Sequence, residues 1–180
     1  MAKIDTEPLE LWEYQAIQAQ LPPHWQLFYW LLWETGLRVS EALGIQKADL
    51  KDAGIMATRL KKKKPQVDLI PLPPTLLQAL YLQVQAVRGK RLFPYTRGGA
   101  WLALKRASEL AGVRRSMHPH LYRHGFGHRG SKLNLGLTAL EHEALLQRLM
   151  GHSSPVSTRV YFKPTEAEVQ QAWRKFHKRK

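Results

Sequence analysis

The chain has 180 residues and no cysteine, and its 28 Lys and Arg against 14 Asp and Glu give a net charge of +14. Without cysteine, the protein cannot contain disulfides, thiolate metal sites or a cysteine nucleophile. No apolar run approaches the roughly 20 residues of a membrane-spanning helix, and the first residues lack the apolar stretch of a signal peptide. We therefore expect a cytoplasmic protein of one domain.

The positive charge is concentrated toward the C-terminus. Residues 1–60 carry five basic and eight acidic residues, whereas residues 61–180 carry 23 basic and six acidic residues. A surface that only keeps a protein soluble mixes the two signs, while a surface that binds a polyanion concentrates positive charge. The distribution predicts a polyanionic partner, of which nucleic acid is the commonest.

Three helices are predicted at the start of the chain. Apolar residues at helical spacing predict a helix over residues 8–20. A second helix, over residues 24–35, is apolar on nearly every face, which places it in the core. Gly36 ends this helix, as glycine commonly does, and a short helix follows over residues 39–44.

The pattern then changes to two short β-prone runs, residues 54–60 and 66–71, on either side of a lysine-rich segment. They predict a β-hairpin with a basic tip, and residues 91–93 are a candidate third strand. Helical spacing resumes in residues 74–87, 98–111, 119–131, 137–150 and 165–177. The sequence thus predicts a mainly α-helical domain with a small antiparallel β-sheet, an α+β fold.

Four segments carry side chains suited to phosphate chemistry. Residues 35–41 read Thr-Gly-Leu-Arg-Val-Ser-Glu, and the basic hairpin tip follows them. Residues 120–124 read His-Leu-Tyr-Arg-His, so that a histidine and an arginine share one helical face. Gly151-His152 comes next, nine residues before a tyrosine. The candidate residues are Arg38, Lys61, Lys62, Lys63, Lys64, His120, Arg123, His152 and Tyr161.

In their order, these segments resemble the catalytic domain of the tyrosine recombinases, the lambda-integrase-like family, over about residues 8–165. The resemblance implies the DNA breaking-and-rejoining fold and a site-specific recombinase or integrase that acts on double-stranded DNA through a 3′-phosphotyrosyl intermediate. It implies phosphoryl transfer without a metal ion, ATP or another cofactor. It also implies self-association on DNA, with a basic C-terminal helix and tail over residues 165–180 docking on a neighbouring copy.

The resemblance also implies a role for each candidate. Tyr161 attacks the phosphate that Arg38 and Arg123 hold, His120 accepts the phenol proton, and His152 donates a hydrogen bond to the phosphate. Guanidinium groups suit this task because they bind phosphate bidentately and stay charged. The phenol needs a proton acceptor because its ordinary pKa is near 10.

A lysine of the hairpin tip would protonate the leaving 5′-oxygen. Counted back from residues 67–71, the family register points to Lys63, but hairpin lengths vary and the other three lysines stay open. The remaining expected DNA contacts are Lys61, Lys62, Lys64, His124 and Arg159.

The chain departs from the family pattern at Tyr122, where leucine is usual, at residues 125–127, where Thr/Ser-Phe-Ala is common, in an insertion over residues 132–136, and on its N-terminal side. Gly127 stands where alanine is common. The N-terminal core-binding domain of family members is expected to be absent, because the pattern begins almost at Met1. A single catalytic domain over residues 1–180 is the resulting expectation.

Several alternatives remain open. Arg38 could be a helix-terminal arginine that pairs only with Glu41. A zinc ion could bind to the histidines spaced by four residues, namely His120, His124 and His128. The chain could also be a non-catalytic DNA-binding module of the same fold, or an enzyme that relaxes supercoils in the manner of a topoisomerase.

Overall fold

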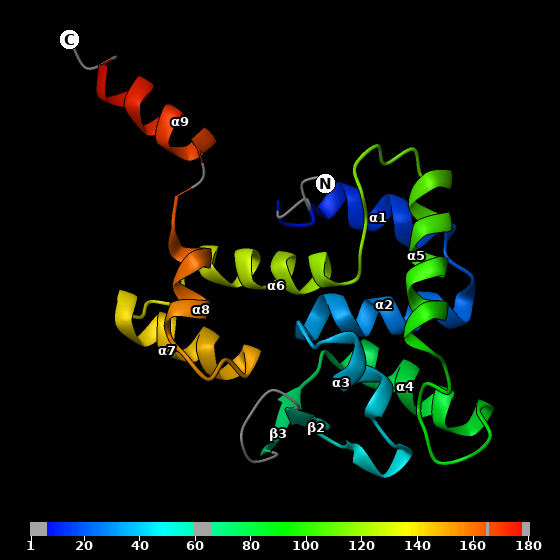
Figure 1. Ribbon diagram of the computed structural model, residues 1–180. Helices are drawn as coiled ribbons and strands as arrows, with labels where there is room; N and C mark the ends of the chain where they lie inside the picture. Colours follow the sequence, from blue (N-terminus) through cyan, green and yellow to red (C-terminus); the bar gives the residue numbers. More distant parts are fainter. Residues whose placement is uncertain (1–6, 60–65, 165, 178–180) are drawn as a thin grey trace.

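The computed structural model describes residues 7–59, 66–164 and 166–177 (Figure 1). The predicted α+β class is confirmed, because most of these residues are helical and the strands form one small sheet. The helices are α1 (Leu11–Gln20), α2 (Pro23–Thr35), α3 (Val39–Gly44), α4 (Pro74–Ala86), α5 (Arg97–Leu110), α6 (His120–Lys132), α7 (Ala139–Met150), α8 (Val156–Arg159) and α9 (Glu166–His177). The other elements are the 3-10 helices η1 (Lys47–Asp49) and η2 (Val160–Phe162) and the strands β1 (Leu50–Lys51), β2 (Gly54–Arg59) and β3 (Gln66–Pro71).

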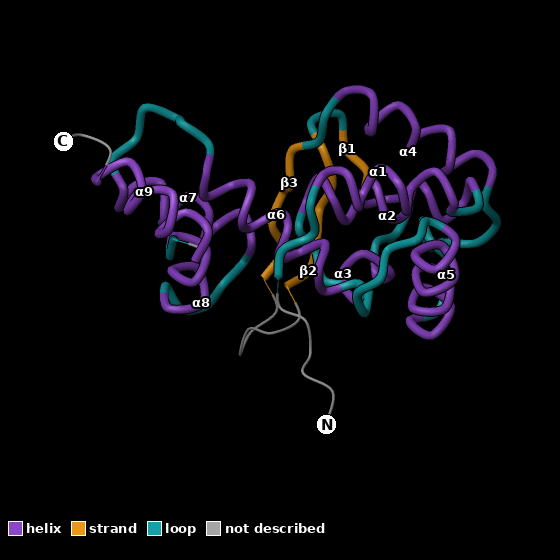
Figure 2. Tube along the Cα trace, turned by 90° about the horizontal axis from the view of Figure 1, so that it is seen from above, coloured by secondary structure: helices purple, strands orange, loops and turns teal. Residues whose placement is uncertain are grey.

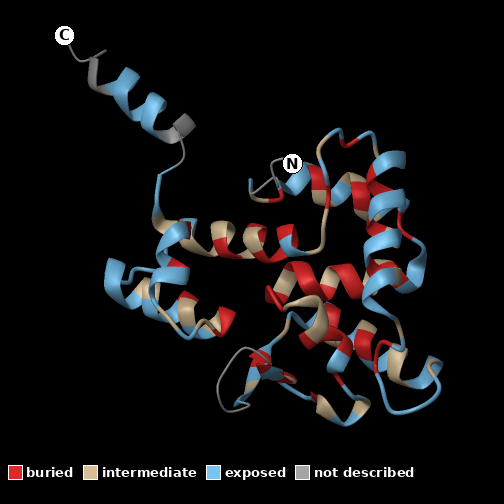
Figure 3. Cartoon of the chain, in the orientation of Figure 1, coloured by how far each residue is buried: buried red, intermediate tan, exposed pale blue. Residues whose placement is uncertain are grey.

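Helix α2 forms the centre of the main core, as its sequence predicts. Phe28, Tyr29, Leu31 and Leu32 are completely buried, and Trp25, Trp33 and Thr35 of the same helix are buried as well. The hydroxyl of Tyr29 donates a hydrogen bond of 2.6 Å to a backbone carbonyl of α5. Gly36 ends α2 with a left-handed φ of +61°, a conformation that favours glycine. Figure 3 shows that buried residues are concentrated around α2.

The sheet is antiparallel with the strand order β1-β2-β3. The hairpin prediction is confirmed, with a register that pairs Gly54 with Pro71 and Arg59 with Gln66. The third strand is not residues 91–93, as the sequence suggested, but β1. Arg91 makes only one isolated bridge, to Gln46. The following two residues are buried in the core instead, and Pro94 cannot extend a ladder because it lacks a backbone N–H.

A second, smaller cluster forms at the C-terminal side of the molecule. It contains the buried Leu146, Met150 and Tyr161, with Phe126 and Phe162 packed against them. Seen from above, helices α7, α8 and α9 lie on one side, α1 to α5 lie on the other, and α6 lies between the two groups (Figure 2). Because α6 contributes to both groups, a residue on α6 can be placed where they meet. None of the described helices is both long and apolar enough to cross a membrane.

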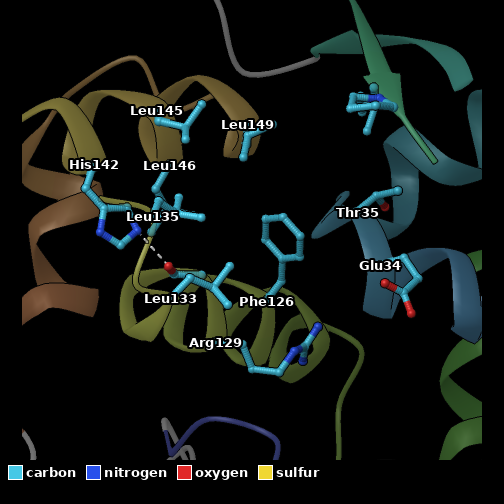
Figure 4. A pocket seen from close by; sticks show the side chains of 13 residues that line it. Glu34, Thr35, Phe126, Arg129, Leu133, Leu135, His142, Leu145, Leu146 and Leu149 are labelled. Carbon is cyan, nitrogen blue, oxygen red and sulfur yellow. Dashed lines mark hydrogen bonds between the residues drawn. The ribbon is translucent and has the colours of Figure 1, made fainter. Parts of the chain in front are cut away.

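The two clusters do not pack tightly along their whole boundary. A cavity of about 400 Å3 lies where α6 and α7 face the end of α2 and β3, and leucine side chains make up much of its lining (Figure 4). Its walls include Phe126, Leu133, Leu135, Leu145, Leu146 and Leu149. Attachment of the smaller cluster to the core therefore depends on specific polar contacts as well as on apolar packing.

Arg115 ties the loop between α5 and α6 to α1. Its guanidinium binds the carboxylate of Glu13, with an Nε–Oε1 distance of 2.6 Å, and also donates to the backbone carbonyl oxygens of Glu7 and Pro8. Glu13 is buried and also accepts from the backbone N–H of Glu10. The arginine is thus the charged partner of a buried carboxylate.

We predict that Arg115→Met lowers the free energy of unfolding by about 3 kcal/mol, because it leaves the Glu13 carboxylate buried without its cation. Urea denaturation followed by circular dichroism measures this loss. Arg106→Met, at an exposed position on α5, is the matched control and should change stability by less than about 0.5 kcal/mol. Equal stability of the two variants would contradict the prediction.

Candidate active site

Arg38 lies at the N-cap of α3, just beyond the glycine that ends α2. Its Nη1 donates to Glu41 Oε1 at 2.7 Å, and its backbone N–H donates to Glu41 Oε2 at 3.0 Å. Glu41 is buried, whereas the Arg38 side chain is partly exposed. The pairing with Glu41 that the sequence raised as an alternative is therefore present. It uses one of the three guanidinium nitrogens and fixes the direction of the group.

Arg123 is buried on α6 and spans the boundary between the two clusters. Its Nη1 donates to the carbonyl oxygen of Gly36 at 2.7 Å, and its Nη2 donates to that of Met150 at 2.6 Å. Burial and the nearby charge of Arg38 lower its pKa to about 10, so that it stays charged at neutral pH. Three of the five guanidinium N–H groups remain for a ligand.

Three of the predicted residues line one cavity. Arg38, His120 and Arg123 form part of the wall of a cavity of about 740 Å3. Arg97 and Trp101 of α5 line it as well. Neither residue stands out in the sequence, where the signal is a spacing of four residues at the start of a predicted helix. Their positive charge and exposed aromatic ring extend the polar site toward α5.

Tyr161 lies in η2 and is mostly buried. Its hydroxyl is 3.3 Å from Nδ1 of His124, and its ring lies nearly parallel to that of His152, with 6.2 Å between centroids. A Cβ atom at Gly127 would lie only 2.6 Å from the tyrosine ring. The glycine that departs from the family pattern therefore makes room for the tyrosine. The phenol partner is His124 rather than His120, whose ring instead packs edge-to-face against His124 at 4.6 Å.

His152 follows the glycine that ends α7. Gly151 has a left-handed φ of +62°, which turns the chain sharply and places His152 beside Tyr161. Nδ1 of His152 forms a hydrogen bond of 2.9 Å with Oγ1 of Thr158, a fully buried residue of α8. The sequence alone does not mark Thr158 as a residue of the site, because a threonine three residues before the tyrosine is not a distinctive pattern.

Burial and positive charge set the protonation of the site. Burial lowers the pKa of both His120 and His152 to about 4; His124 and Arg123 add to the effect at His120, and Arg123 and Arg38 add to it at His152. Both histidines are therefore neutral at pH 7. Burial raises the pKa of the Tyr161 phenol, while the charges of Arg123 and Arg38 act against this rise. The arginines thus favour the phenolate that a nucleophilic tyrosine requires.

The remaining predicted residues are placed as follows. Lys61, Lys62, Lys63 and Lys64 lie outside the described residues. The Arg159 side chain is exposed and donates to Glu143 Oε1 at 2.9 Å, so it is held on the surface of α7. Among residues 7–59, 66–164 and 166–177, no three His, Asp or Glu side chains are arranged to hold a metal ion.

Comparison with known proteins places these residues in a wider group. Residues 9–168 match the phage integrase family. The tyrosine recombinase XerD of Mycobacterium leprae is 30% identical over 169 residues, which cover 83% of this chain and 51% of that protein. The chain thus spans about half the length of such curated relatives.

Two solved structures share the fold. The XerH site-specific recombinase bound to its palindromic difH substrate, in a post-cleavage complex, has a TM-score of 0.71 at 20% identity, covering 93% of this chain and 52% of that one. The catalytic domain of bacteriophage HP1 integrase has a TM-score of 0.68 at 22% identity, covering 91% of this chain and 92% of that domain. The fold is therefore that of a tyrosine recombinase catalytic domain.

We predict that His120 and His152 titrate near pH 4 in an NMR titration of the DNA-free protein. Histidines in the unfolded chain titrate near pH 6.5. Between these values the unfolded state binds more protons, so the free energy of unfolding should fall as the pH is lowered from about 6.5 to 4. His120→Gln removes one titration and assigns the signals. A midpoint at or above 6.5 for either wild-type ring would contradict the prediction.

Proposed function

Because the chain belongs to the phage integrase family of tyrosine recombinases, we propose that it cuts and rejoins double-stranded DNA through Tyr161. The observation that carries this proposal is the convergence of Arg38, His120 and Arg123 on one cavity. Tyr161 is connected to this cavity through His124, whose ring packs against His120, and His152 lies beside Tyr161. The XerH structure, in which a related fold is bound to DNA after cleavage, supports DNA as the substrate.

The guanidinium groups of Arg38 and Arg123 bind the scissile phosphate in this mechanism. Glu41 holds the guanidinium of Arg38 in place before DNA binds, and two backbone carbonyl groups hold that of Arg123. Fixed cations stabilise the charge that develops on the phosphate oxygens without a cost of reorganisation during the reaction. These two charges take the part that a metal ion plays in other phosphoryl-transfer enzymes, so we propose that the reaction needs neither a metal nor ATP.

Covalent attack proceeds from the tyrosine. The Tyr161 oxygen forms a bond to phosphorus as the bond from phosphorus to the 5′-oxygen breaks, which gives a 3′-phosphotyrosine and a free 5′-hydroxyl. In the resting site the phenol is held on His124, whose ring is neutral because burial lowers its pKa. When the phenol turns to the phosphate, His120 takes its proton. Rejoining reverses these steps and conserves the bond energy.

His152 contributes a hydrogen bond from its Nε2–H group. The Thr158 hydroxyl donates to Nδ1 in this arrangement, which fixes the tautomer that carries its proton on Nε2. That N–H then donates to a phosphate oxygen. A hairpin lysine, Lys63 by register, protonates the leaving oxygen, and Lys61, Lys62, Lys64, His124 and Arg159 contact the DNA backbone, where positive charge gives affinity.

We predict that wild-type protein forms a covalent adduct with a nicked suicide DNA substrate, in the presence of EDTA, and that Tyr161→Phe forms none. The phenylalanine variant keeps the ring but lacks the nucleophilic oxygen. Tyr81→Phe is the matched control, because Tyr81 is exposed and its hydroxyl donates a hydrogen bond to Asp52 on the surface. Denaturing gel electrophoresis measures the adduct.

The same assay distinguishes the two histidines. His120→Ala should lower the adduct rate more than His124→Ala, because His124 holds the resting phenol and His120 accepts the proton. DNA binding without an adduct in the wild type would indicate a non-catalytic module instead. An adduct that persists in Tyr161→Phe would refute the assignment of the nucleophile.

The identity of the general acid can be tested by changing the leaving atom. We predict that Lys63→Ala lowers the cleavage rate about 100-fold or more on ordinary DNA, but cleaves a substrate with a 5′-bridging sulfur at nearly the wild-type rate. A thiolate leaves without protonation, so the missing acid no longer matters. Lys61→Ala, Lys62→Ala and Lys64→Ala are the matched controls. If the sulfur substrate restores cleavage by one of these control variants and not by Lys63→Ala, the lysine changed in that variant is the general acid.

We also propose that α9 mediates association between copies on DNA. This helix extends away from the rest of the chain (Figure 1). Val169 and Trp173, four residues apart on one face of the helix, are 52% and 62% exposed. An apolar face of this kind on a projecting helix is suited to burial against a second copy.

Trp173→Glu should abolish cooperative binding of a second copy to DNA with two sites, as measured by gel shift. Trp12→Glu on α1 is the control, because Trp12 is also 62% exposed. Binding to a single site should be unchanged in both variants. Equal cooperativity in the wild type and Trp173→Glu would exclude α9 as the contact.

A further inference from the structure

Arg59 is a second fully buried arginine beside the candidate site. It is the last residue of β2, and only 1% of its surface is exposed. Its position at the base of the hairpin, two residues before Lys61, gave no reason to expect burial. Because burying a guanidinium is costly unless it is paired, the partners of Arg59 show which parts of the molecule it holds together.

The guanidinium of Arg59 contacts three elements. Its Nε donates to Asp68 Oδ2 on β3 at 3.1 Å, and its Nη2 donates to the carbonyl oxygen of Leu149 on α7 at 2.6 Å. Its Nη1 lies 3.6 Å from Glu41 Oε2. Glu41 is the carboxylate that binds Arg38 through its other oxygen. One buried side chain therefore joins the hairpin, the end of α7 and the carboxylate that orients a phosphate-binding arginine.

Arg59 and Arg123 hold consecutive carbonyl groups at the end of α7. Arg59 binds the carbonyl of Leu149, and Arg123 binds that of Met150. The last carbonyls of a helix lack partners within the helix, and cations are favourable at this end. Gly151 packs directly on Arg59, because a Cβ atom at this glycine would lie 2.6 Å from Arg59 Nε. The turn that places His152 therefore rests on the Arg59 side chain.

We propose that Arg59 is a positioning residue that sets His152, Arg38 and the base of the lysine hairpin in a fixed arrangement around the bound phosphate. The inference rests on the proposed function. Arg59 acts on Arg38 through Glu41, on His152 through the Leu149–Gly151 turn, and on the hairpin through Asp68. Its side chain is buried and its contacts with Asp68, Leu149 and Glu41 lie within the protein, so we assign it a role through these neighbours.

Arg59→Met removes the charged guanidinium group and its N–H donors but keeps a long, unbranched side chain. We expect the rate of adduct formation to fall about 100-fold, because small misplacements of catalytic groups have effects of this size. We also expect the pKa of His152 to rise in the DNA-free protein. Burial, Arg123, Arg38, Arg59 and His120 all lower that pKa, and the variant removes one of them. The pKa of His120, which Arg59 does not lower directly, should change less than that of His152.

Two further variants complete the experiment. Arg59→Lys keeps the charge but cannot hold Asp68 and the Leu149 carbonyl in one planar fork. It should keep the pKa of His152 near that of the wild type and still cleave at least about 10-fold more slowly. Arg115→Met controls for lost stability, because it removes a buried ion pair whose two residues do not line the cavity of the site. It should change neither the adduct rate nor the titration of His152.

The outcomes separate this proposal from the proposed function. Absence of an adduct in the wild type would refute the function, whereas the NMR titration tests Arg59 without DNA. Cleavage by Arg59→Met at the wild-type rate, or an unchanged pKa of His152 in that variant, would overturn the positioning role. Failure of both Arg59 variants to fold would also overturn it, because Arg59 would then serve stability alone.

Discussion

A single buried guanidinium connects the parts of the chain that form the site. Arg123 donates to the carbonyl of Gly36, at the end of α2, and to that of Met150, at the end of α7. Arg38 follows the first carbonyl by two residues and His152 follows the second by two. The two hydrogen bonds therefore fix these motif residues relative to each other, although they are distant in sequence. They also offset the cost of burying a charge where the two clusters meet.

The same buried charge determines the electrostatics of the site. Positive charge and burial together keep the histidines neutral, and the arginines oppose the effect of burial on the phenol. A phosphate anion bound between Arg38 and Arg123 would neutralise part of this field and raise the pKa of His120. The proposed base would therefore become stronger once a phosphate is bound. The resting phenol, held on His124 and packed against Gly127, is meanwhile kept from solvent.

Apolar periodicity was sufficient to predict the α+β class, the buried α2 and the hairpin, because each depends on local pattern. The candidate third strand over residues 91–93 was wrong: an extended apolar segment can be buried without pairing, and only tertiary packing decides which occurs. Arg38, His120, Arg123, His152 and Tyr161 stand out in the sequence because their motifs are distinctive, and the structure brings Arg38, His120 and Arg123 to one cavity. Arg59, Thr158 and the contact of His124 with the phenol could not be predicted, since each depends on elements that meet only in the folded chain.

In the proposed reaction, the oxygen of Tyr161 becomes the atom bonded to DNA. Mass spectrometry of the trapped complex after trypsin and nuclease digestion tests this directly. Cleavage after Arg159 and Arg174, but not between Lys163 and Pro164, yields a peptide over residues 160–174 that contains one tyrosine. We expect this peptide to carry the remaining phosphonucleotide on Tyr161. A nucleotide on any other residue, or an unmodified peptide from a confirmed covalent complex, would contradict it.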